Sequence, residues 1–176
     1  ILDQLDPPIA FTFVNDDIYL ALHKSPADSG QIVSFNINDP EASYQILFDG
    51  LTYPRAIKEH DSILYIGMRD AIVACDLRDE ILAFDTLAQE QFLFPRAFAF
   101  DGNDLYVAHD KQLSKIDLTK PNAGMRSLRF FEDSPLALAW YENDLLIAEG
   151  NSIHRYELGF VFEEIIADLE ESVYTM

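Results

Sequence analysis

The sequence predicts an all-β protein, a β-propeller of four-stranded antiparallel blades with four blades in this chain. Three observations predict it. A segment of about 40 residues recurs four times along the chain. Within each copy, short apolar runs alternate with polar turns rich in Asn, Asp and Gly. The chain also contains 13 Phe and 8 Tyr, residue types that favour strands.

Each copy opens on a proline that leads into a first apolar strand. The openings are Pro8-Ile9-Ala10, Pro54-Arg55-Ala56, Pro95-Arg96-Ala97 and Pro135-Leu136-Ala137. A polar turn follows each of them, at residues 15–17, 59–61, 101–104 and 142–144. Because Asn, Asp and Gly tolerate a left-handed backbone, these turns suit tight hairpins between the first and second strands.

The second strand of each copy ends in a small residue, which suits the crowded centre of a propeller where inner strands converge. These strands are Ile18–Ala21, Leu64–Gly67, Leu105–Ala108 and Leu145–Ala148. Third strands are expected at Ile32–Ile37, Ile72–Leu77, Leu113–Leu118 and Ile153–Leu158. Three of the third strands end in an acid followed by Leu, and the first ends in Asn36-Ile37.

A longer first copy is explained by an insertion between its second and third strands. The segment His23 to Gly30 supplies the extra residues, as expected when repeats vary in one loop. Fourth strands are expected at Tyr44–Phe48, Ile81–Leu87, Met125–Phe131 and Phe160–Leu169. The last of these also has some helical spacing, but the repeat favours a strand there.

The repeat divides a single propeller domain, residues 1–176, into blades at about 8–53, 54–94, 95–134 and 135–176. Residues 1–7 resemble the end of a preceding outer strand. We therefore expect the four blades to belong to a larger ring of about six, or alternatively to close as a four-blade ring. Because unpaired strand edges invite association, open propeller edges also predict self-association.

The composition limits the classes of partner. The net charge is −19, with 12 Lys and Arg against 31 Asp and Glu. No basic stripe is visible for a nucleic acid, and no apolar run is long enough to insert into a membrane. The charge favours a cationic partner, a metal ion or a neutral ligand, or it serves solubility alone. The single cysteine, Cys75, is expected in the core. The sequence indicates no cellular compartment.

The third copy carries a resemblance to a known superfamily. The stretch from Phe94 to Ala108 combines a proline, a small residue, an apolar strand, a Gly-Asn turn and an aromatic-aliphatic strand. It resembles the NHL-repeat superfamily of propellers, which is related to gluconolactonase-like and strictosidine-synthase-like propellers. The chain is a divergent match, because Ala replaces the Gly that usually follows the proline. The resemblance implies the architecture far more than an activity.

One propeller face is expected to carry a ligand site, because loops before the first strand and after the second strand emerge together. The residues expected there are Arg55, Arg96, His23, Arg69, His109, Asp110 and Glu149. Arginines in a pocket would recognise a carboxylate or another polar ligand. Alternatively, Arg55 and Arg96 pair with acids such as Asp110 and Glu149 and hold blades together. A metal pair of His109 with Glu149 is a further alternative.

Acidic hairpin turns are expected on the opposite face, where Ca²⁺ or another divalent ion is one interpretation and solvation the other. The chain contains no nucleophile motif or phosphate loop. We therefore expect a non-catalytic binding or scaffold module for a protein or a small polar ligand. The alternative is a metal-dependent hydrolase or lactonase of the gluconolactonase type. That family's Glu before the first proline is replaced here by Pro7, Tyr53, Phe94 and Ser134.

Overall fold

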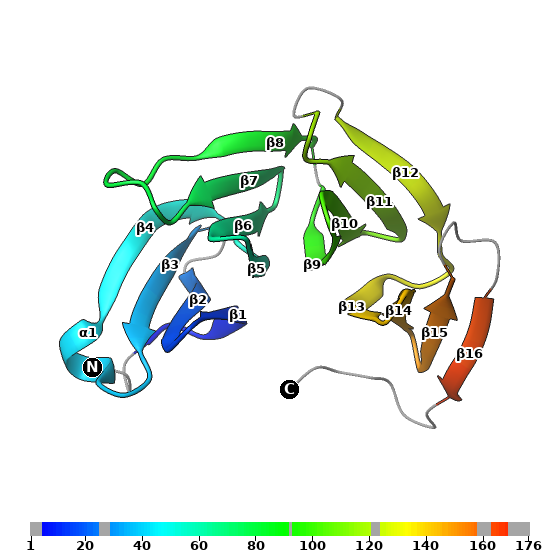
Figure 1. Cartoon of the computed structure of the whole chain (residues 1–176), viewed down its shortest axis with the longest axis horizontal. Helices are drawn as coiled ribbons and strands as arrows, with labels where there is room; N and C mark the ends of the chain where they lie inside the picture. Colours follow the sequence, from blue (N-terminus) through cyan, green and yellow to red (C-terminus); the bar gives the residue numbers. More distant parts are fainter. Residues whose placement is uncertain (1–4, 25–28, 92, 121–123, 158–162, 169–176) are drawn as a thin grey trace. The chain divides into compact units, whose positions relative to one another are not determined.

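The computed structural model describes residues 5–24, 29–91, 93–120, 124–157 and 163–168, and these residues are mostly in strands (Figure 1). The strands form four four-stranded antiparallel sheets, and in each sheet the neighbours follow chain order. One sheet corresponds to each repeat of the sequence, so the predicted fold class is confirmed. We number these sheets blades 1 to 4.

The chain divides into two compact units, residues 1–94 (unit 1) and 95–176 (unit 2). Unit 1 contains blades 1 and 2. Their elements are β1 (Pro8–Val14), β2 (Asp17–Lys24), β3 (Ser29–Asn36), α1 (Pro40–Ser43), β4 (Gln45–Thr52), β5 (Ala56–His60), β6 (Ile63–Met68), β7 (Ala71–Asp76) and β8 (Asp85–Gln89). Unit 2 contains blades 3 and 4. Their strands are β9 (Pro95–Asp101), β10 (Asp104–His109), β11 (Gln112–Asp117), β12 (Met125–Phe130), β13 (Pro135–Tyr141), β14 (Asp144–Glu149), β15 (Ser152–Tyr156) and β16 (Glu163–Asp168).

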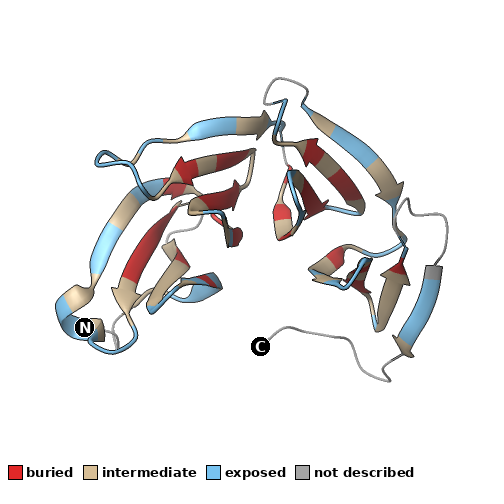
Figure 2. Cartoon of the chain, in the orientation of Figure 1, coloured by how far each residue is buried: buried red, intermediate tan, exposed pale blue. Residues whose placement is uncertain are grey.

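Within each unit, the two blades pack face to face through apolar side chains. In unit 1, Ala21 and Ile32 of blade 1 meet Ile57 and Ile66 of blade 2 in one buried cluster. In unit 2, a second cluster joins blades 3 and 4, and Tyr106 contacts Trp140 edge to face at a ring-centroid distance of 5.3 Å. Figure 2 shows that the buried residues concentrate on the second and third strands of the blades. Cys75 is 1% exposed, which confirms its expected place in the core.

The insertion in the first copy lengthens a hairpin. β2 and β3 remain paired as far as His23 with Gly30 and Lys24 with Ser29, so β3 begins three residues before the expected Ile32. Residues 25–28 lie outside the described residues.

Two fourth strands differ from expectation. In blade 1, the helix α1 precedes β4: the Asp39 carboxylate accepts a hydrogen bond from the Ala42 amide, and Pro40 begins the helix. In blade 2, the strand predicted from Ile81 begins only at Asp85. Ile81 is 83% exposed, because a turn extends the loop after β7.

The sequence predicted strand residues near both ends of the chain. Glu163–Asp168 is a strand paired with β15, so the strand interpretation of this segment is confirmed over the helix. The expected residues 160–162 and Leu169 lie outside the described residues. The same holds for residues 1–4, and the described residues 5–7 are not in a strand.

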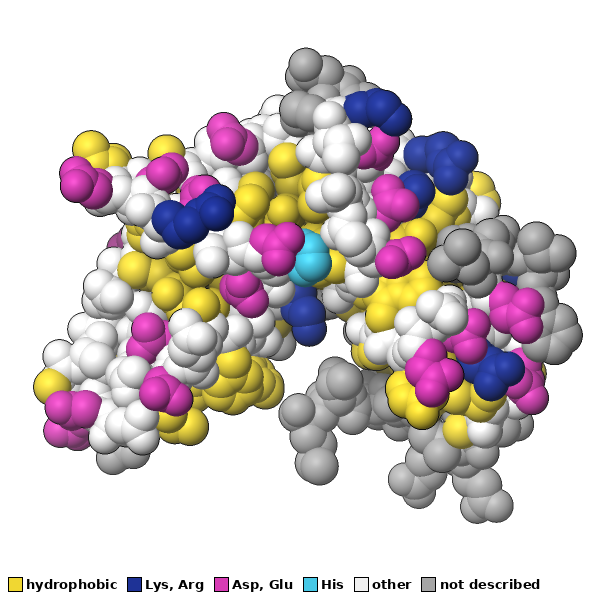
Figure 3. All heavy atoms as spheres, viewed as in Figure 1, with side chains coloured by type: hydrophobic (Ala, Val, Ile, Leu, Met, Phe, Trp, Pro, Cys, Tyr) yellow, Lys and Arg dark blue, Asp and Glu magenta, His cyan; other side chains and the backbone are white. Residues whose placement is uncertain are grey.

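On the face shown in Figure 3, acidic side chains are spread over both units, with fewer basic ones among them. Several of the acids in the hairpin turns have cross-strand partners. The Lys115 ammonium donates to Asp104 at 2.7 Å, and Arg155 Nε lies 3.4 Å from an Asp144 carboxylate oxygen. These pairs engage two of the turn carboxylates that the sequence suggested as Ca²⁺ ligands.

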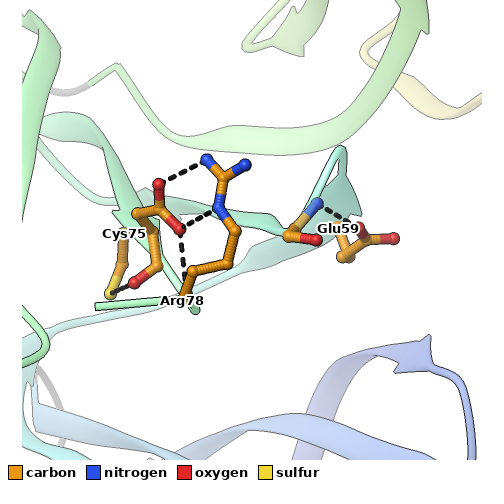
Figure 4. A network of polar contacts seen from close by, with 5 residues as sticks. Glu59, Cys75 and Arg78 are labelled. Carbon is orange, nitrogen blue, oxygen red and sulfur yellow. Dashed lines mark hydrogen bonds and ion pairs between the residues drawn. The ribbon is translucent and has the colours of Figure 1, made fainter. Parts of the chain in front are cut away.

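The acid that ends the third strand has a structural role. The Asp76 carboxylate accepts hydrogen bonds from the Arg78 amide at 2.9 Å and from its guanidinium, which folds back over the turn (Figure 4). Asp117 likewise accepts from the Thr119 amide at 3.0 Å. Asn36 does the same for the Asn38 amide at 3.0 Å. The acid or Asn at this position therefore closes a turn in three of the four blades.

Candidate functional site

Unit 1 places three polar or aromatic side chains together where β2 ends and β5 begins. The rings of His23 and Tyr53 lie 4.8 Å apart in an edge arrangement. The Arg55 guanidinium lies over the same Tyr53 ring, 5.3 Å from its centroid. All three side chains are partly buried. Two of the predicted site residues, His23 and Arg55, thus both contact Tyr53. Tyr53 was not among the residues that the sequence predicted for the site.

Tyr53 has a backbone conformation that is rare for its type. Its φ is 49°, in the left-handed region, and it directly precedes Pro54. A proline disfavours helical conformations in the preceding residue, and a bulky side chain at positive φ is strained. Phe94, at the equivalent position before Pro95, has φ 45°. The recurrence shows that the residue before the opening proline is held in this conformation in both blades.

Arg69 follows β6 in the same unit and is tied to its neighbour. Its Nε lies 3.1 Å from a carboxylate oxygen of Asp70. Its backbone amide donates to the Thr52 carbonyl at 3.1 Å, and its carbonyl accepts from the Phe94 amide at 3.0 Å. The backbone of Arg69 therefore links the segments before two opening prolines.

Three predicted site residues of unit 2 lie in or beside blade 3. His109 is 6% exposed, and its Nε2 lies 2.8 Å from the Ser114 hydroxyl, so it is held inside its own blade. Arg96 is partly buried in β9. Asp110 is exposed in the following turn with φ 45°.

A pocket of about 380 Å³ lies beside Glu149, the remaining predicted site residue. All of its lining comes from unit 2. The lining residues are Arg129 to Asp133, at and after the end of β12, together with Glu149 to Ser152 and His154. Its volume falls in the range of ligand pockets, which is about 300–1,000 Å³.

Glu149 is fixed at the wall of this pocket by two contacts. Its Oε1 accepts a hydrogen bond from the Asp133 amide at 3.0 Å. Its Oε2 lies 3.9 Å from Nε2 of His154. The two side chains are 14% and 13% exposed, respectively.

Hairpin register explains the pairing of Glu149 with His154. Glu149 is opposite Ser152 across the turn, and His154 is two residues further along β15, on the same sheet face. Blade 3 repeats this arrangement, since His109 is opposite Gln112 and contacts Ser114. Had the turns been assigned to residues 110–111 and 150–151, the sequence would have placed both pairs on shared sheet faces.

Arg129 is held by aromatic rings. Its guanidinium lies 4.8 Å from the centroid of the Tyr156 ring and 5.7 Å from that of Phe131. Tyr156 is fully buried, so one side of the guanidinium rests on the core between blades 3 and 4. This cation is thus part of the blade junction as well as of the pocket lining.

Among the described residues, no group of three or more His, Cys, Asp and Glu is arranged to hold a metal ion. The two residues suggested as a metal pair contact different partners: His109 contacts Ser114, whereas Glu149 contacts Asp133 and His154. In the same part of the chain, no helix is long and apolar enough to cross a membrane.

Comparison with known proteins identifies the fold. No family model and no curated protein match the chain. Among solved structures, it is similar to a β-propeller in the crystal structure of a nidogen/laminin complex, with TM-score 0.75 and 18% identity over 96% of this chain. The chain spans 65% of the length of that protein.

Two further structures support the same fold. One is the extracellular domain of BT4673 of B. thetaiotaomicron, with TM-score 0.71 and 16% identity over 97% of this chain and 23% of that one. The other is the computationally designed Ika4 protein, with TM-score 0.60 and 16% identity over 88% of this chain and 92% of that one. The chain is therefore a β-propeller protein with blades of four antiparallel strands, and identities this low show the fold alone.

Proposed function

We propose that the chain is a non-catalytic binding module and that its pocket in unit 2 receives a cationic group of the partner. The observation that supports this most is the partly buried carboxylate of Glu149, fixed at the pocket wall by the Asp133 amide. A carboxylate already oriented by a backbone donor pays little further cost in entropy when it accepts a bond from a ligand.

The charges of the pocket lining favour a cation over an anion. Glu132, Asp133 and Glu149 contribute three carboxylates, whereas Arg129 contributes one guanidinium that lies on aromatic rings. His154 lies next to Glu149 and adds a positive charge only when protonated. The net charge of −19 would also steer a basic partner toward the chain.

The cationic group has two possible sources with the same chemistry. One is a Lys or Arg side chain on the surface of a partner protein, and the other is a free amine such as a polyamine. A protein partner would bring further contacts around the pocket, so we expect a Lys- and Arg-containing peptide to bind more tightly than spermidine.

Isothermal titration calorimetry at low ionic strength tests this proposal with spermidine and a Lys/Arg-rich peptide as probes. Glu149→Gln removes the charge but keeps the shape, and we expect it to weaken peptide binding about tenfold or more, as for a charge-assisted hydrogen bond. Glu157→Gln, which changes an exposed acid outside the pocket, is the matched control and should bind normally. Equal binding by the Glu149 and Glu157 variants would refute the pocket as the site.

Carboxylate recognition by the predicted Arg/His face is a separate proposal. The contact of Arg55 with Tyr53 supports it in unit 1, and Arg96 and His109 are its members in unit 2. Succinate and an acidic peptide are suitable probes. Arg55→Ala and Arg96→Ala should lose affinity at unchanged stability, whereas a loss of stability alone would assign the arginines to blade packing.

We also propose that binding requires no divalent ion. Stoichiometric Ca²⁺ or Zn²⁺ should leave the melting temperature unchanged, because a ligand stabilises a protein only by binding its folded state. An increase in melting temperature with either ion would instead favour the metal-dependent hydrolase.

A further inference from the structure

One sheet face of blade 1 is built like a face that is buried elsewhere in the same unit. In each blade, one sheet face carries the third residue after the opening proline, together with the residues opposite it in the second and third strands. We call this face the leading face. In blade 2 this face carries Ile57, Ile66 and Val73, which are opposite one another across β5, β6 and β7. They are 6%, 0% and 3% exposed because they pack against blade 1.

The leading face of blade 1 has the same register and is equally apolar. Phe11 is opposite Leu20, and Leu20 is opposite Val33. Val33 is buried, but the innermost strand is not: Phe11 is 61% exposed and Phe13 is 50% exposed. Their rings contact each other edge to face at 5.6 Å. On β4, Ile46 is opposite Val33 and 52% exposed.

The exposure of β1 contrasts with the burial of β6 and β7. In Figure 2, β1 is mostly coloured as exposed or intermediate, whereas β6 and β7 are largely buried. Exposed apolar patches of adjacent large side chains mark interaction surfaces. No described residue of unit 1 covers Phe11 as blade 1 covers Ile57.

Within each unit, one sheet face of the first blade covers the leading face of the second blade, and this covering face has a recognisable composition. We call it the trailing face. In blade 1 it carries Ala10, Ala21 and Ile32, which are register partners in three successive strands. In blade 3 the equivalent set is Ala97, Ala108 and Leu113. Small residues on the first two strands leave room for the larger side chains of the next blade.

Blade 4 presents a trailing face of the same composition. Ala137, Ala148 and Ile153 are register partners there, and Ala139 is opposite Leu146. Ala139 is exposed, and Leu146 and Ile153 are partly exposed. The chain therefore carries both halves of a blade junction, each of them uncovered by the described residues of its own unit.

We propose that the leading face of blade 1 docks against the trailing face of blade 4 of a second copy of this chain. The occupant is a second copy because blade 4 has the register of two alanines and one larger aliphatic residue that covers leading faces inside both units. Such a contact is heterologous, so it builds a closed assembly or a longer chain of copies. It involves neither Glu149 nor Arg129, so it is independent of the proposed cation pocket.

Sedimentation velocity of the 176-residue chain across a hundredfold concentration range tests the proposal. We expect the wild type to form dimers or larger species. Phe11→Glu and Ala139→Glu should each remain monomeric, because each places a charge in one half of the junction. Ile81→Glu changes a side chain that is 83% exposed and outside both faces, so this control should associate like the wild type. At a concentration low enough to dissociate the wild type, circular dichroism should show the same melting temperature for all four proteins.

Mixing the two monomeric variants gives the sharpest outcome. The Phe11 variant keeps an intact trailing face, and the Ala139 variant keeps an intact leading face, so their mixture should form a one-to-one complex. A monomeric wild type at every concentration would overturn the proposal, and so would association unchanged by Phe11→Glu. A monomeric wild type that Phe11→Glu destabilises would show that the chain covers this face itself.

Discussion

At the scale of single residues, the most unusual feature is the strained backbone before the opening prolines. Tyr53 and Phe94 both have positive φ, where a side chain other than glycine costs about 1–2 kcal/mol. Strain of this kind persists where the surrounding structure determines it and is common at binding sites. The Tyr53 ring contacts both His23 and Arg55.

Two substitutions at Tyr53 separate the strain from the ring. Tyr53→Ala removes the ring but keeps a Cβ at positive φ, whereas Tyr53→Gly removes both. We expect the Gly variant to be more stable than the Ala variant by about 1 kcal/mol, as measured by urea unfolding. A more stable Ala variant would contradict the strained conformation.

Asp117 predicts a specific pH dependence of stability. Hydrogen bonds from Lys120 and Thr119 lower the pKa of the Asp117 carboxyl to about 2, compared with about 3.9 in unfolded chains. A lowered pKa in the folded state stabilises the protein above about pH 4, and this contribution is lost as the pH falls toward 2. Asp117→Asn should therefore destabilise the chain at pH 7 and progressively less toward pH 3.

Carbon-13 titration of the Asp117 carboxyl measures the same quantity directly, and a midpoint near 4 would contradict it. Glu157→Gln, which removes one exposed negative charge, is the control for net charge in the unfolding series.

At the scale of elements, the close approach of β3 to the start of blade 2 depends on one glycine. A Cβ added at Gly30 would lie 2.5 Å from the Leu22 carbonyl oxygen and would collide with the Pro54 ring. Gly30 is therefore required by space rather than by a left-handed backbone. It brings the long hairpin of β2 and β3 against the proline that opens blade 2.

Gly30→Ala should cost about 1–3 kcal/mol of unfolding free energy, the range found for overpacked sites. Ser29→Ala, at the neighbouring position of β3, is the control and should change stability by less than about 0.5 kcal/mol. Chemical denaturation measures both. A Gly30 variant as stable as the wild type would mean that β3 and Pro54 can separate without cost.

The sequence was sufficient for most strands because two signals coincided in every copy. The opening proline fixed the start of the repeat, and the polar turn fixed the register of the first hairpin, as the positive φ of Asn15 and Asp61 shows. Outer strands were less predictable, since they are half exposed and have weaker alternation. The helix α1 carried a readable signal, Asp39 followed by Pro40, that the repeat pattern obscured.

At the scale of the whole molecule, the candidate site was less predictable than the fold. The sequence selected Glu149 because its place at the end of a second strand follows from the repeat. It could not select Arg129, because the place of Arg129 beside Glu149 depends on how blade 4 packs on blade 3. It missed His154 because the register of the hairpin within blade 4 was not assigned. The Arg/His face as a whole stays a prediction, with His23, Arg55 and Arg69 in unit 1 and the others in unit 2.

We propose above all that this propeller binds a cationic group at Glu149. Titrating the nitrogen-15-labelled chain with a Lys/Arg-rich peptide, observed by two-dimensional NMR, tests this claim most directly. The Asp133 amide is bonded to the Glu149 carboxylate and should report any ligand there. We predict saturable shifts at Asp133, Gly150 and His154 that Glu149→Gln abolishes. Shifts confined to the acidic hairpin turns, with none at Asp133, would contradict the account.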